Sequence, residues 1–331
     1  MKAKKIIFVG FLVLLFLAFS LWFAQSKGSK DPTDLFPVVV NGKWGFIDRE
    51  GNIIINPEYD DIGFFSEQLA FFIQKGKFGY LNRGGKVVIK PQYKHASFFS
   101  EGLAPAGIED KLGYINKMGK FIIKPQYDLA LPFSEGLAAV WIDEKLGYID
   151  RNGNMVIRPQ FQHGRSFSEG LAQVWIGRGV GFIDKKGKLV IPGPFTNAED
   201  FSEGLAAVTI GVFKGFVNMN GDVVIKPEFD WVTSFREGLA AVKIGANYGY
   251  INKKGEVVIS PQFEGAWEFS EGLAAVRIGK KHGFVDKTGK MVIEPKYKHA
   301  GDFSNGLSEV YIGDKRGYIN RLGRYVWNPS N

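Results

Sequence analysis

The chain has 331 residues, a formal net charge of +8 and no cysteine. The length suits two ordinary domains or one extended array, and the lack of cysteine excludes disulfides, thiolate catalysis and cysteine-based zinc sites. Without Lys2, Lys4 and Lys5, 39 basic residues (42 − 3) face 34 acidic ones, a net charge of +5 that is scattered along the chain. Nucleic-acid binders concentrate basic residues on one stripe, so we expect no nucleic-acid partner.

The first 24 residues are typical of a signal peptide or an N-terminal membrane anchor. A basic start precedes an uninterrupted apolar or small run from Ile6 to Ala24. This run is long for a cleavable signal peptide and long enough for a spanning helix, so cleavage stays open. The positive-inside rule predicts an extracytoplasmic chain, either secreted or anchored to the cytoplasmic membrane, whose membrane contact is limited to residues 6–24. We expect one hydrophobic helix over 1–24 and a linker over 25–37.

From residue 38 onward the sequence repeats every 34 residues, without insertion or deletion. The repeat is clearest at the glycines Gly45, Gly79, Gly113, Gly147, Gly181, Gly215, Gly249, Gly283 and Gly317. A period of 34 is also that of helical tetratricopeptide repeats. That alternative fails, because each copy contains several Gly and Pro residues, which cost about 1 and 3 kcal/mol in a helix interior.

Each copy instead predicts three strands, as in 138–142, 147–150 and 155–157. In the first of them, residues 138, 140 and 142 form one face with a period of two, which is typical of a strand. Short polar or glycine-containing loops between them suit hairpins, and residues 160–170 form a connector. The sequence therefore predicts an all-β fold of nine three-stranded antiparallel meanders over 38–331. Because both terminal meanders look self-complete, we expect them to stack as an open superhelical array. A closed propeller-like ring is the alternative.

Apolar pairs in the second and third strands predict that both faces of these strands are covered. The second strand has Tyr148-Ile149, and the third has runs such as Val223-Val224-Ile225. Consecutive strand residues point to opposite faces, so neighbouring repeats must supply the cover. We further expect Gly147 to leave room for a neighbouring aromatic ring, in which case Gly147→Val should destabilise the array.

Three segments carry a family resemblance: Lys43 to Asp48 (KWGFID), Ile259 to Phe263 (ISPQF) and Phe269 to Ala274 (FSEGLA). They resemble the WG-repeat (KWG) family of bacterial proteins, and the resemblance covers nearly all of 38–331. It implies a β-repeat interaction module, often exported. The tryptophan is present only in the first copy, as Trp44, so the family name does not imply a functional tryptophan here.

The recurring polar residues predict turns rather than active sites. A glutamate recurs as Glu67, Glu101, Glu135, Glu169, Glu203, Glu237 and Glu271. An Asp or Asn recurs as Asp48, Asn82, Asn116, Asp150, Asp184, Asn218, Asn252, Asp286 and Asn320, which suits turn initiation. His95, His163 and His299 share a connector position in separate repeats, too far apart to share a zinc ion. No known catalytic motif is present. We expect no enzyme activity, cofactor or metal, and leave a calcium dependence open.

Recognition in a repeat protein can lie in variable positions on a fixed frame. The outward position of the first strand holds Ile73, Gly107, Trp141, Trp175, Thr209, Lys243, Arg277 and Tyr311, and the connectors add Trp231 and Trp267. The ligand-binding candidates are therefore Trp141, Trp175, Trp231, Trp267, Lys243, Arg277 and Tyr311. The alternative is that they cover seams between strands. The sequence favours a monomeric, non-catalytic extracytoplasmic scaffold for a protein partner, with a cell-wall glycan-binding module as the alternative.

Overall fold

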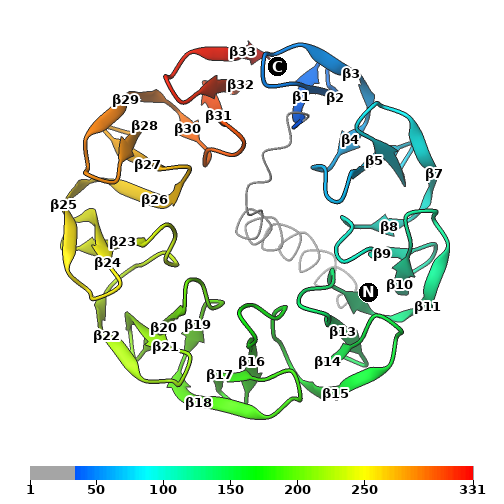
Figure 1. Cartoon of the computed structure of the whole chain (residues 1–331), viewed down its shortest axis with the longest axis horizontal. Coiled ribbons are helices and arrows are strands. Elements are labelled where there is room, and N and C mark those ends of the chain that lie inside the picture. The colour runs from blue at the N-terminus through cyan, green and yellow to red at the C-terminus, as the bar shows by residue number, and fades with distance from the viewer. Residues whose placement is uncertain (1–33, 331) are drawn as a thin grey trace, which may run out of the picture. The chain divides into compact units, whose positions relative to one another are not determined.

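The computed structural model describes residues 34–330, and every regular element in this range is a β-strand. Residues 35–331 form one compact unit, a β-propeller ring of nine small antiparallel sheets (Figure 1). The helix predicted over 1–24 and most of the predicted linker lie outside the described residues. No helix within 34–330 is long and apolar enough to cross a membrane.

Each sheet is one blade with three long strands, and blades are numbered in chain order. The first strands are β1 (Phe36–Val40), β5 (Leu69–Gln74), β9 (Ala104–Gly107), β13 (Ala138–Ile142), β16 (Ala172–Ile176), β20 (Leu205–Ile210), β23 (Leu239–Ile244), β27 (Leu273–Ile278) and β31 (Leu307–Ile312). The second strands are β2 (Lys43–Ile47), β6 (Lys77–Asn82), β10 (Leu112–Ile115), β14 (Lys145–Ile149), β17 (Gly179–Ile183), β21 (Phe213–Asn218), β24 (Asn247–Asn252), β28 (Lys281–Asp286) and β32 (Lys315–Asn320). The third strands are β3 (Ile53–Tyr59), β7 (Val87–Tyr93), β11 (Phe121–Tyr127), β15 (Met155–Phe161), β18 (Leu189–Phe195), β22 (Val223–Phe229), β25 (Val257–Phe263), β29 (Met291–Tyr297) and β33 (Tyr325–Ser330).

A short innermost strand adds a fourth member to six of the blades. These strands are β4 (Asp61–Ile62), β8 (His95–Ala96), β12 (Leu129–Ala130), β19 (Asn197–Ala198), β26 (Gly265–Ser270) and β30 (His299–Ala300). In blades 5 and 7 a single bridge takes its place, Gly164 to Val174 and Val232 to Val242. The predicted three-stranded meander was therefore incomplete, because the connector pairs with the free edge of the first strand and satisfies its backbone groups.

The turn between the second and third strands forms as predicted. The Asp48 carboxylate accepts backbone N–H groups of Glu50 and Asn52, at 3.0 and 2.8 Å. Gly51 closes the turn with φ of +90°, a conformation that glycine adopts without strain. The turn role predicted for the recurring Asp or Asn is confirmed.

The recurring glycine of the second strand lies against backbone, not against a ring. A Cβ at Gly147 would lie 2.6 Å from the Ile157 carbonyl oxygen and 2.8 Å from the Pro159 nitrogen. The pairing of β14 with β15 is shifted at this point, which marks a bulge. The prediction that Gly147 makes room for a neighbouring aromatic ring was wrong. The bulge also explains how proline is tolerated in the third strand.

The hydrophobic core is divided among the seams between blades. At the seam between blades 4 and 5, Tyr148 packs on Phe167 with ring centroids 5.0 Å apart. Equivalent pairs, at 4.7–5.0 Å, occupy every seam from blade 1 to blade 9. Tyr148 and Ile149 are both fully buried, which confirms the prediction for the second strand.

The prediction of two covered faces was wrong for the third strand. Val223 and Val224 are both exposed, and only Ile225 of that run is buried. The third strands form the outer rim of the ring (Figure 1), where neighbouring blades diverge. Apolar side chains at the start of these strands therefore lie beyond the reach of the next blade.

The ring closes between blades 9 and 1. The Tyr318 hydroxyl donates to the Pro37 carbonyl oxygen at 3.0 Å, and its ring lies 5.5 Å from that of Phe36. Val38 and Leu307 belong to the same buried cluster. The predicted open superhelical array was wrong, and the alternative of a closed ring is confirmed. Self-complete terminal blades do not prevent closure, because side-chain packing joins them without a shared strand.

Candidate functional site

One side of the ring gathers the variable positions of the repeat. The hairpins between first and second strands all lie on this side, which we call the hairpin face, because no insertion shifts the repeat. The opposite side, the turn face, carries the turns between second and third strands. At the hairpin end of blade 4, Leu129 of the connector pairs with Trp141, and Trp141 pairs with Leu146 of the second strand. The same three positions form one such row in blades 2 to 9.

The two tryptophans predicted in blades 4 and 5 differ in exposure. Trp141 is 8% exposed and belongs to the cluster that joins the two blades, with Leu146 and Val174. It covers a seam, as the alternative interpretation had it. Trp175, one repeat later, is 40% exposed, and the exposed His163 ring lies edge-on to it at 5.6 Å. Of this pair, only Trp175 presents its ring to solvent.

The predicted connector tryptophans are half-buried: Trp231 belongs to the row of blade 7, and Trp267 lies beside the row of blade 8, two residues after Gly265. Trp231 packs edge-on against Tyr248, with ring centroids 5.3 Å apart. Trp267 packs against His282 at 4.9 Å. Burial lowers the pKa of His282. Both tryptophans contribute mainly to seam packing.

The remaining candidates flank these rings in the rows of blades 7 to 9. Tyr311 is half-buried beside the exposed His299, with centroids 6.2 Å apart. Arg277 is exposed, and its guanidinium donates to the Glu264 carbonyl oxygen at 2.9 Å. Lys243 faces Asp230 across 3.6 Å. The structure therefore brings five of the seven predicted residues into three consecutive blades.

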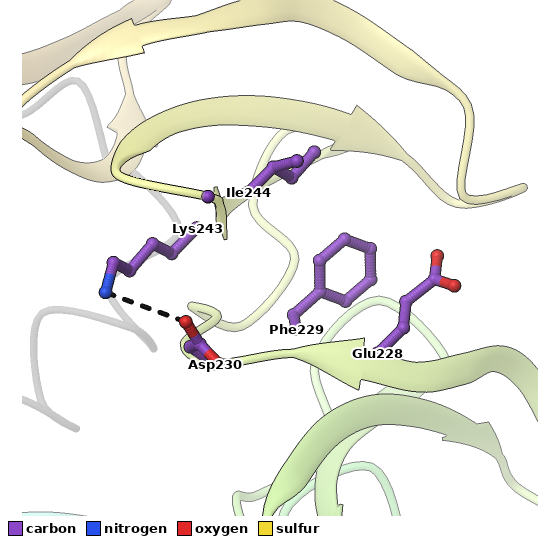
Figure 2. Close-up of a pocket in the computed structure, with 6 residues that line it drawn as sticks. Glu228, Phe229, Asp230, Lys243 and Ile244 are labelled. Carbon is purple, nitrogen blue, oxygen red and sulfur yellow. Dashed lines mark ion pairs between the residues drawn. The ribbon is translucent and has the colours of Figure 1, made fainter.

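Lys243 also lines a pocket at the seam between blades 6 and 7 (Figure 2). The pocket encloses about 300 Å³ between the end of β22 and the hairpin of blade 7. Its lining residues are Glu228, Phe229, Asp230, Lys243, Ile244 and Gly245. The Lys243–Asp230 ion pair lies at its mouth, and both side chains stay in contact with solvent. The pocket has room for one side chain of a partner.

An apolar patch on blades 5 and 6 was missed by the sequence reasoning. Val212 and Phe213 at the hairpin of blade 6 are 78% and 45% exposed, and Ile176 at the hairpin of blade 5 is 39% exposed. Together with Trp175 we call these residues the apolar patch. Its sequence signal is the Gly-Val-Phe hairpin, because exposed hairpin tips ordinarily carry polar residues.

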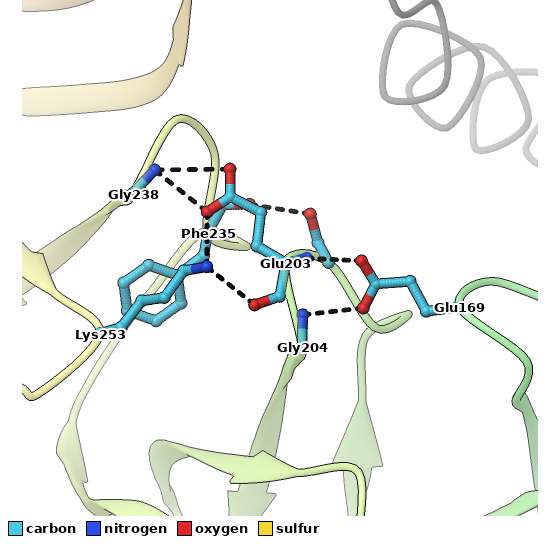
Figure 3. A network of polar contacts seen from close by, with 7 residues as sticks. Glu169, Glu203, Gly204, Phe235, Gly238 and Lys253 are labelled. Carbon is cyan, nitrogen blue, oxygen red and sulfur yellow. Dashed lines mark hydrogen bonds and ion pairs between the residues drawn. The ribbon is translucent and has the colours of Figure 1, made fainter.

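On the turn face, hydrogen bonds link each of blades 2 to 8 to the blade that follows it (Figure 3). Each recurring Glu has a positive φ of 50–56° and accepts the N–H of a glycine in the following blade. The pairs are Glu67–Gly102, Glu101–Gly136, Glu135–Gly170, Glu169–Gly204, Glu203–Gly238, Glu237–Gly272 and Glu271–Gly306. Lysines of the following blade add ion pairs, such as Lys253 to Glu203 at 3.0 Å. The predicted turn role is confirmed, and the side chain adds a link between blades.

A second set of links uses the serine before each glutamate, and it fails at one seam. Ser202 donates to the Phe235 carbonyl oxygen at 2.8 Å, and equivalent serines do so at other seams. At the seam between blades 7 and 8 the serine is replaced by Arg236, which pairs with Glu268 at 2.5 Å. Burial raises the pKa of Glu268 to about 7, which the charge of Arg236 opposes, and the nearby Asp302 raises it further.

A similar cluster joins blades 5 and 6. Arg165 pairs with Glu199 at 2.9 Å and lies 3.7 Å from Asp200. Burial raises the pKa of Asp200 to about 6, against the charge of Arg165. The sequence reasoning missed these clusters because it followed what repeats. Their signal is the departure from the repeat, such as Arg236 among serines. In residues 34–330 no group of three His, Cys, Asp or Glu side chains could hold a metal ion.

The repeat itself matches a known family. The family model described as WG containing repeat matches residues 44–78, 78–111, 113–145, 147–175, 181–211, 215–248, 248–281 and 283–315. The chain belongs to this family. No curated protein matches the chain.

Solved structures resemble the WG-repeat ring in fold. The crystal structure of a eukaryotic initiation factor is 11% identical, with a TM-score of 0.64, and the match covers 90% of this chain and 96% of that one. Dihydro-heme d1 dehydrogenase NirN is 13% identical, with a TM-score of 0.49 and coverage of 82% and 75%. BamB from Moraxella catarrhalis is 11% identical, with a TM-score of 0.39 and coverage of 88% and 92%. At 11% identity the likeness to the initiation factor shows the fold alone.

The one WG tryptophan of this ring lies at the closing seam. The Arg316 guanidinium of blade 9 lies 5.0 Å above the Trp44 ring of blade 1. It also donates to Glu309 at 2.6 Å and to the Tyr318 hydroxyl at 2.9 Å. A cation over an indole ring is a favourable contact of roughly 0.5–2 kcal/mol. The position of Trp44 therefore points to ring closure.

Proposed function

We propose that this WG-repeat ring is a non-catalytic, extracytoplasmic scaffold that binds a protein partner on its hairpin face. One observation carries the proposal: the seams repeat the same contacts from blade to blade, whereas the rows of the hairpin face differ in every blade. A fixed frame with variable positions on one side is how repeat proteins place recognition. The extracytoplasmic location rests on the apolar run from Ile6 to Ala24 after a basic start.

The exposed side chains of the hairpin face favour a protein partner. Large exposed apolar side chains occur at the hairpins of several blades, at Ile108, Val212, Ile278 and Ile312. Blades 5 and 6 together expose Trp175, Ile176, Val212 and Phe213. Exposed apolar patches mark interaction sites, and aromatic residues are enriched where proteins bind one another. The catalytic alternative lacks support, because the buried carboxylates, such as Glu268, are engaged in links between blades.

Site-specific photo-crosslinking in the native host tests the proposal. A photoreactive phenylalanine analogue is placed at Ile108, Val212 or Ile312 on the hairpin face. Met118 and Leu322, which are 80% and 71% exposed on the turn face, are matched controls. We expect a discrete protein adduct from at least one hairpin position and none from the controls. Absence of adducts from all three hairpin positions, or adducts from the turn face alone, contradicts the proposal.

Export is tested separately. A C-terminal reporter that is active only outside the cytoplasm is fused to the full-length chain and to a chain without residues 1–24. We expect activity only with the full-length fusion. Equal activity of the two fusions would contradict an export role for the first 24 residues.

A cell-wall glycan is a second candidate ligand, favoured by the exposed ring of Trp175 with His163 beside it. Aromatic faces stack well on the apolar faces of sugars. The glycan candidate predicts that the ring of residues 35–331 is retained on purified peptidoglycan, that free glycan releases it, and that Trp175→Ala abolishes retention. Retention that persists in Trp175→Ala would exclude this site.

A further inference from the structure

The apolar patch on blades 5 and 6 differs in charge from the hairpins of blades 3 and 4. The hairpin of blade 3 carries Glu109, Asp110 and Lys111, and that of blade 4 carries Asp143 and Glu144. In contrast, the hairpin tips of blades 5, 6 and 7 contain no acidic residue within 177–179, 211–213 and 245–247. The hairpin tips of blades 1, 2 and 8 also lack acidic residues, but they carry Asn, Gly and Lys. Among the described blades, blade 6 therefore combines large apolar residues at its tip with the absence of an acidic residue there.

The charges that border the apolar patch are positive. Arg178 is exposed at the hairpin tip of blade 5, and Lys214 directly follows Phe213 in blade 6. The acidic residues between Glu144 and Glu228 lie elsewhere, in the turns or in the connectors: Asp150, Glu169, Asp184, Glu199, Asp200, Glu203 and Asp222. Glu228 and Asp230 lie on the blade 7 side of the patch, at the pocket where Asp230 pairs with Lys243. At the hairpin tips of the patch itself, carboxylates of a partner would meet Arg178 and Lys214.

We propose that the apolar patch binds an extended segment of the partner protein in which apolar side chains alternate with Asp or Glu. This inference rests on the proposed scaffold function and adds the sector and the chemistry of the partner. Trp175 and Phe213 supply the large, rigid contact area of interface anchors. The Arg178 guanidinium presents a planar fork of donors that matches a carboxylate. Apolar contacts then supply affinity, and the cations select acidic over basic segments.

The test uses three short fluorescent peptides with identical apolar residues. Their alternate positions are all acidic, all neutral or all basic, and binding to the ring of residues 35–331 is measured by fluorescence anisotropy at low salt. We expect the acidic peptide to bind at least about tenfold more tightly than the basic one. Because Arg178 is exposed and Lys214 is only half-buried, raising the salt concentration should reduce that preference.

Two double variants separate the apolar from the charged contribution. Val212→Ser with Phe213→Ser should weaken binding of the acidic and neutral peptides by about tenfold or more. Arg178→Gln with Lys214→Gln should remove the preference for the acidic peptide and leave the neutral peptide unaffected. The matched control, Met118→Ser with Leu322→Ser, removes similarly exposed apolar side chains from the turn face and should change nothing.

Each other outcome overturns the inference. Equal binding of the three peptides, or no binding, would refute the proposed preference for an apolar segment with acidic side chains. A dimer in light scattering that the Val212→Ser/Phe213→Ser variant abolishes would make a second copy the occupant. Retention on peptidoglycan that Trp175→Ala abolishes would make it a glycan. Photo-crosslinks from Ile108 or Ile312 without any from Val212 would leave the scaffold function standing and refute this sector.

Discussion

Substituting glutamine for Glu268 removes a titrating group from the seam between blades 7 and 8. Its side chain is 26% exposed and paired with Arg236, and burial raises its pKa from 4.5 to about 7. The folded ring thus holds this proton more tightly than the unfolded chain. The resulting stabilisation is fully present below pH 4.5 and is lost as the pH rises through 7.

The size of the effect follows from the two pKa values. The stabilisation equals RT ln[(1 + 10^(7−pH))/(1 + 10^(4.5−pH))], which is about 2.6 kcal/mol at pH 5 and about 0.1 kcal/mol at pH 8. We therefore expect Glu268 to lower the unfolding free energy by about 2.5 kcal/mol between pH 5 and pH 8. Urea unfolding followed by tryptophan fluorescence measures this quantity. Asp200 and Asp302 shift in the same direction, so the decisive number is the difference between wild type and Glu268→Gln.

Glu268→Gln also leaves Arg236 without its ion-pair partner, which could itself change the stability. A second variant controls for this effect. Arg236→Ser with Glu268→Ser gives this seam the serine found at the other seams, as Ser202 is in the preceding blade. We expect it to fold and to lack the pH dependence assigned to Glu268. If wild type and Glu268→Gln change by the same amount between pH 5 and pH 8, within about 0.5 kcal/mol, the reasoning is refuted.

Substitutions at three further positions, two of them with a comparison variant, test the frame of the ring by thermal or urea unfolding. Gly147→Ala should cost about 3 kcal/mol or more, because its Cβ would meet the Ile157 carbonyl. Gly84→Ala, whose Cβ would make only an ordinary contact with the Asn82 side chain, should cost under about 0.5 kcal/mol, and equal costs would contradict the bulge explanation. Tyr318→Phe removes the hydroxyl that donates to the Pro37 carbonyl oxygen and should lower the unfolding free energy by about 1–3 kcal/mol. Backbone amide hydrogen exchange in β1 should become faster. Unchanged exchange in β1 would argue against a role of Tyr318 in closing the ring. Glu135→Ala and Glu135→Gly both lose the hydrogen bond to Gly170, and both must adopt the positive φ of 54° at this position. Because glycine adopts a positive φ with less strain than alanine, Glu135→Gly should be more stable than Glu135→Ala by about 1 kcal/mol. The reverse order would contradict the turn geometry.

The strands and turns of each blade could be predicted because their causes are local. Alternation in Ala138 to Ile142 gives a strand whose predicted bounds match β13. The Asp48 and Glu135 turns depend on residues within a few positions of each other. Neighbouring repeats supply identical environments, so a pattern seen once holds in every copy.

Closure of the ring could not be predicted in the same way. It depends on the angle between successive blades summed over the whole array, and no single repeat encodes that sum. The contact that closes the ring, between Tyr318 and Pro37, joins residues 281 positions apart. The innermost strands were missed for a related reason, because two residues such as Asp61 and Ile62 are too few to show a period.

The exposure of the candidate site residues could not be predicted from the sequence either. Trp141 and Trp175 occupy the same position in consecutive repeats, yet one is buried and the other exposed. Their row partners differ, with Leu129 and Leu146 beside Trp141 and His163 and Val180 in the next blade. A branched leucine on each side covers an indole ring, whereas an exposed imidazole and a smaller valine leave it open. The outcome depends on three positions at once.

The division of labour between the two faces explains how one frame can carry varied surfaces. The contacts that hold neighbouring blades together are the aromatic pair in the seam, as in Tyr148–Phe167, and the glutamate link on the turn face, as in Glu135–Gly170. Neither uses the hairpin tips, so substitutions such as Val212→Ser should alter recognition at little cost to stability, since distant sites contribute additively. The exception is the seam with Arg236 and Glu268, where a departure from the repeat changes the frame itself. Substitutions on the hairpin face can therefore change the partner at a smaller loss of stability than substitutions in the seams.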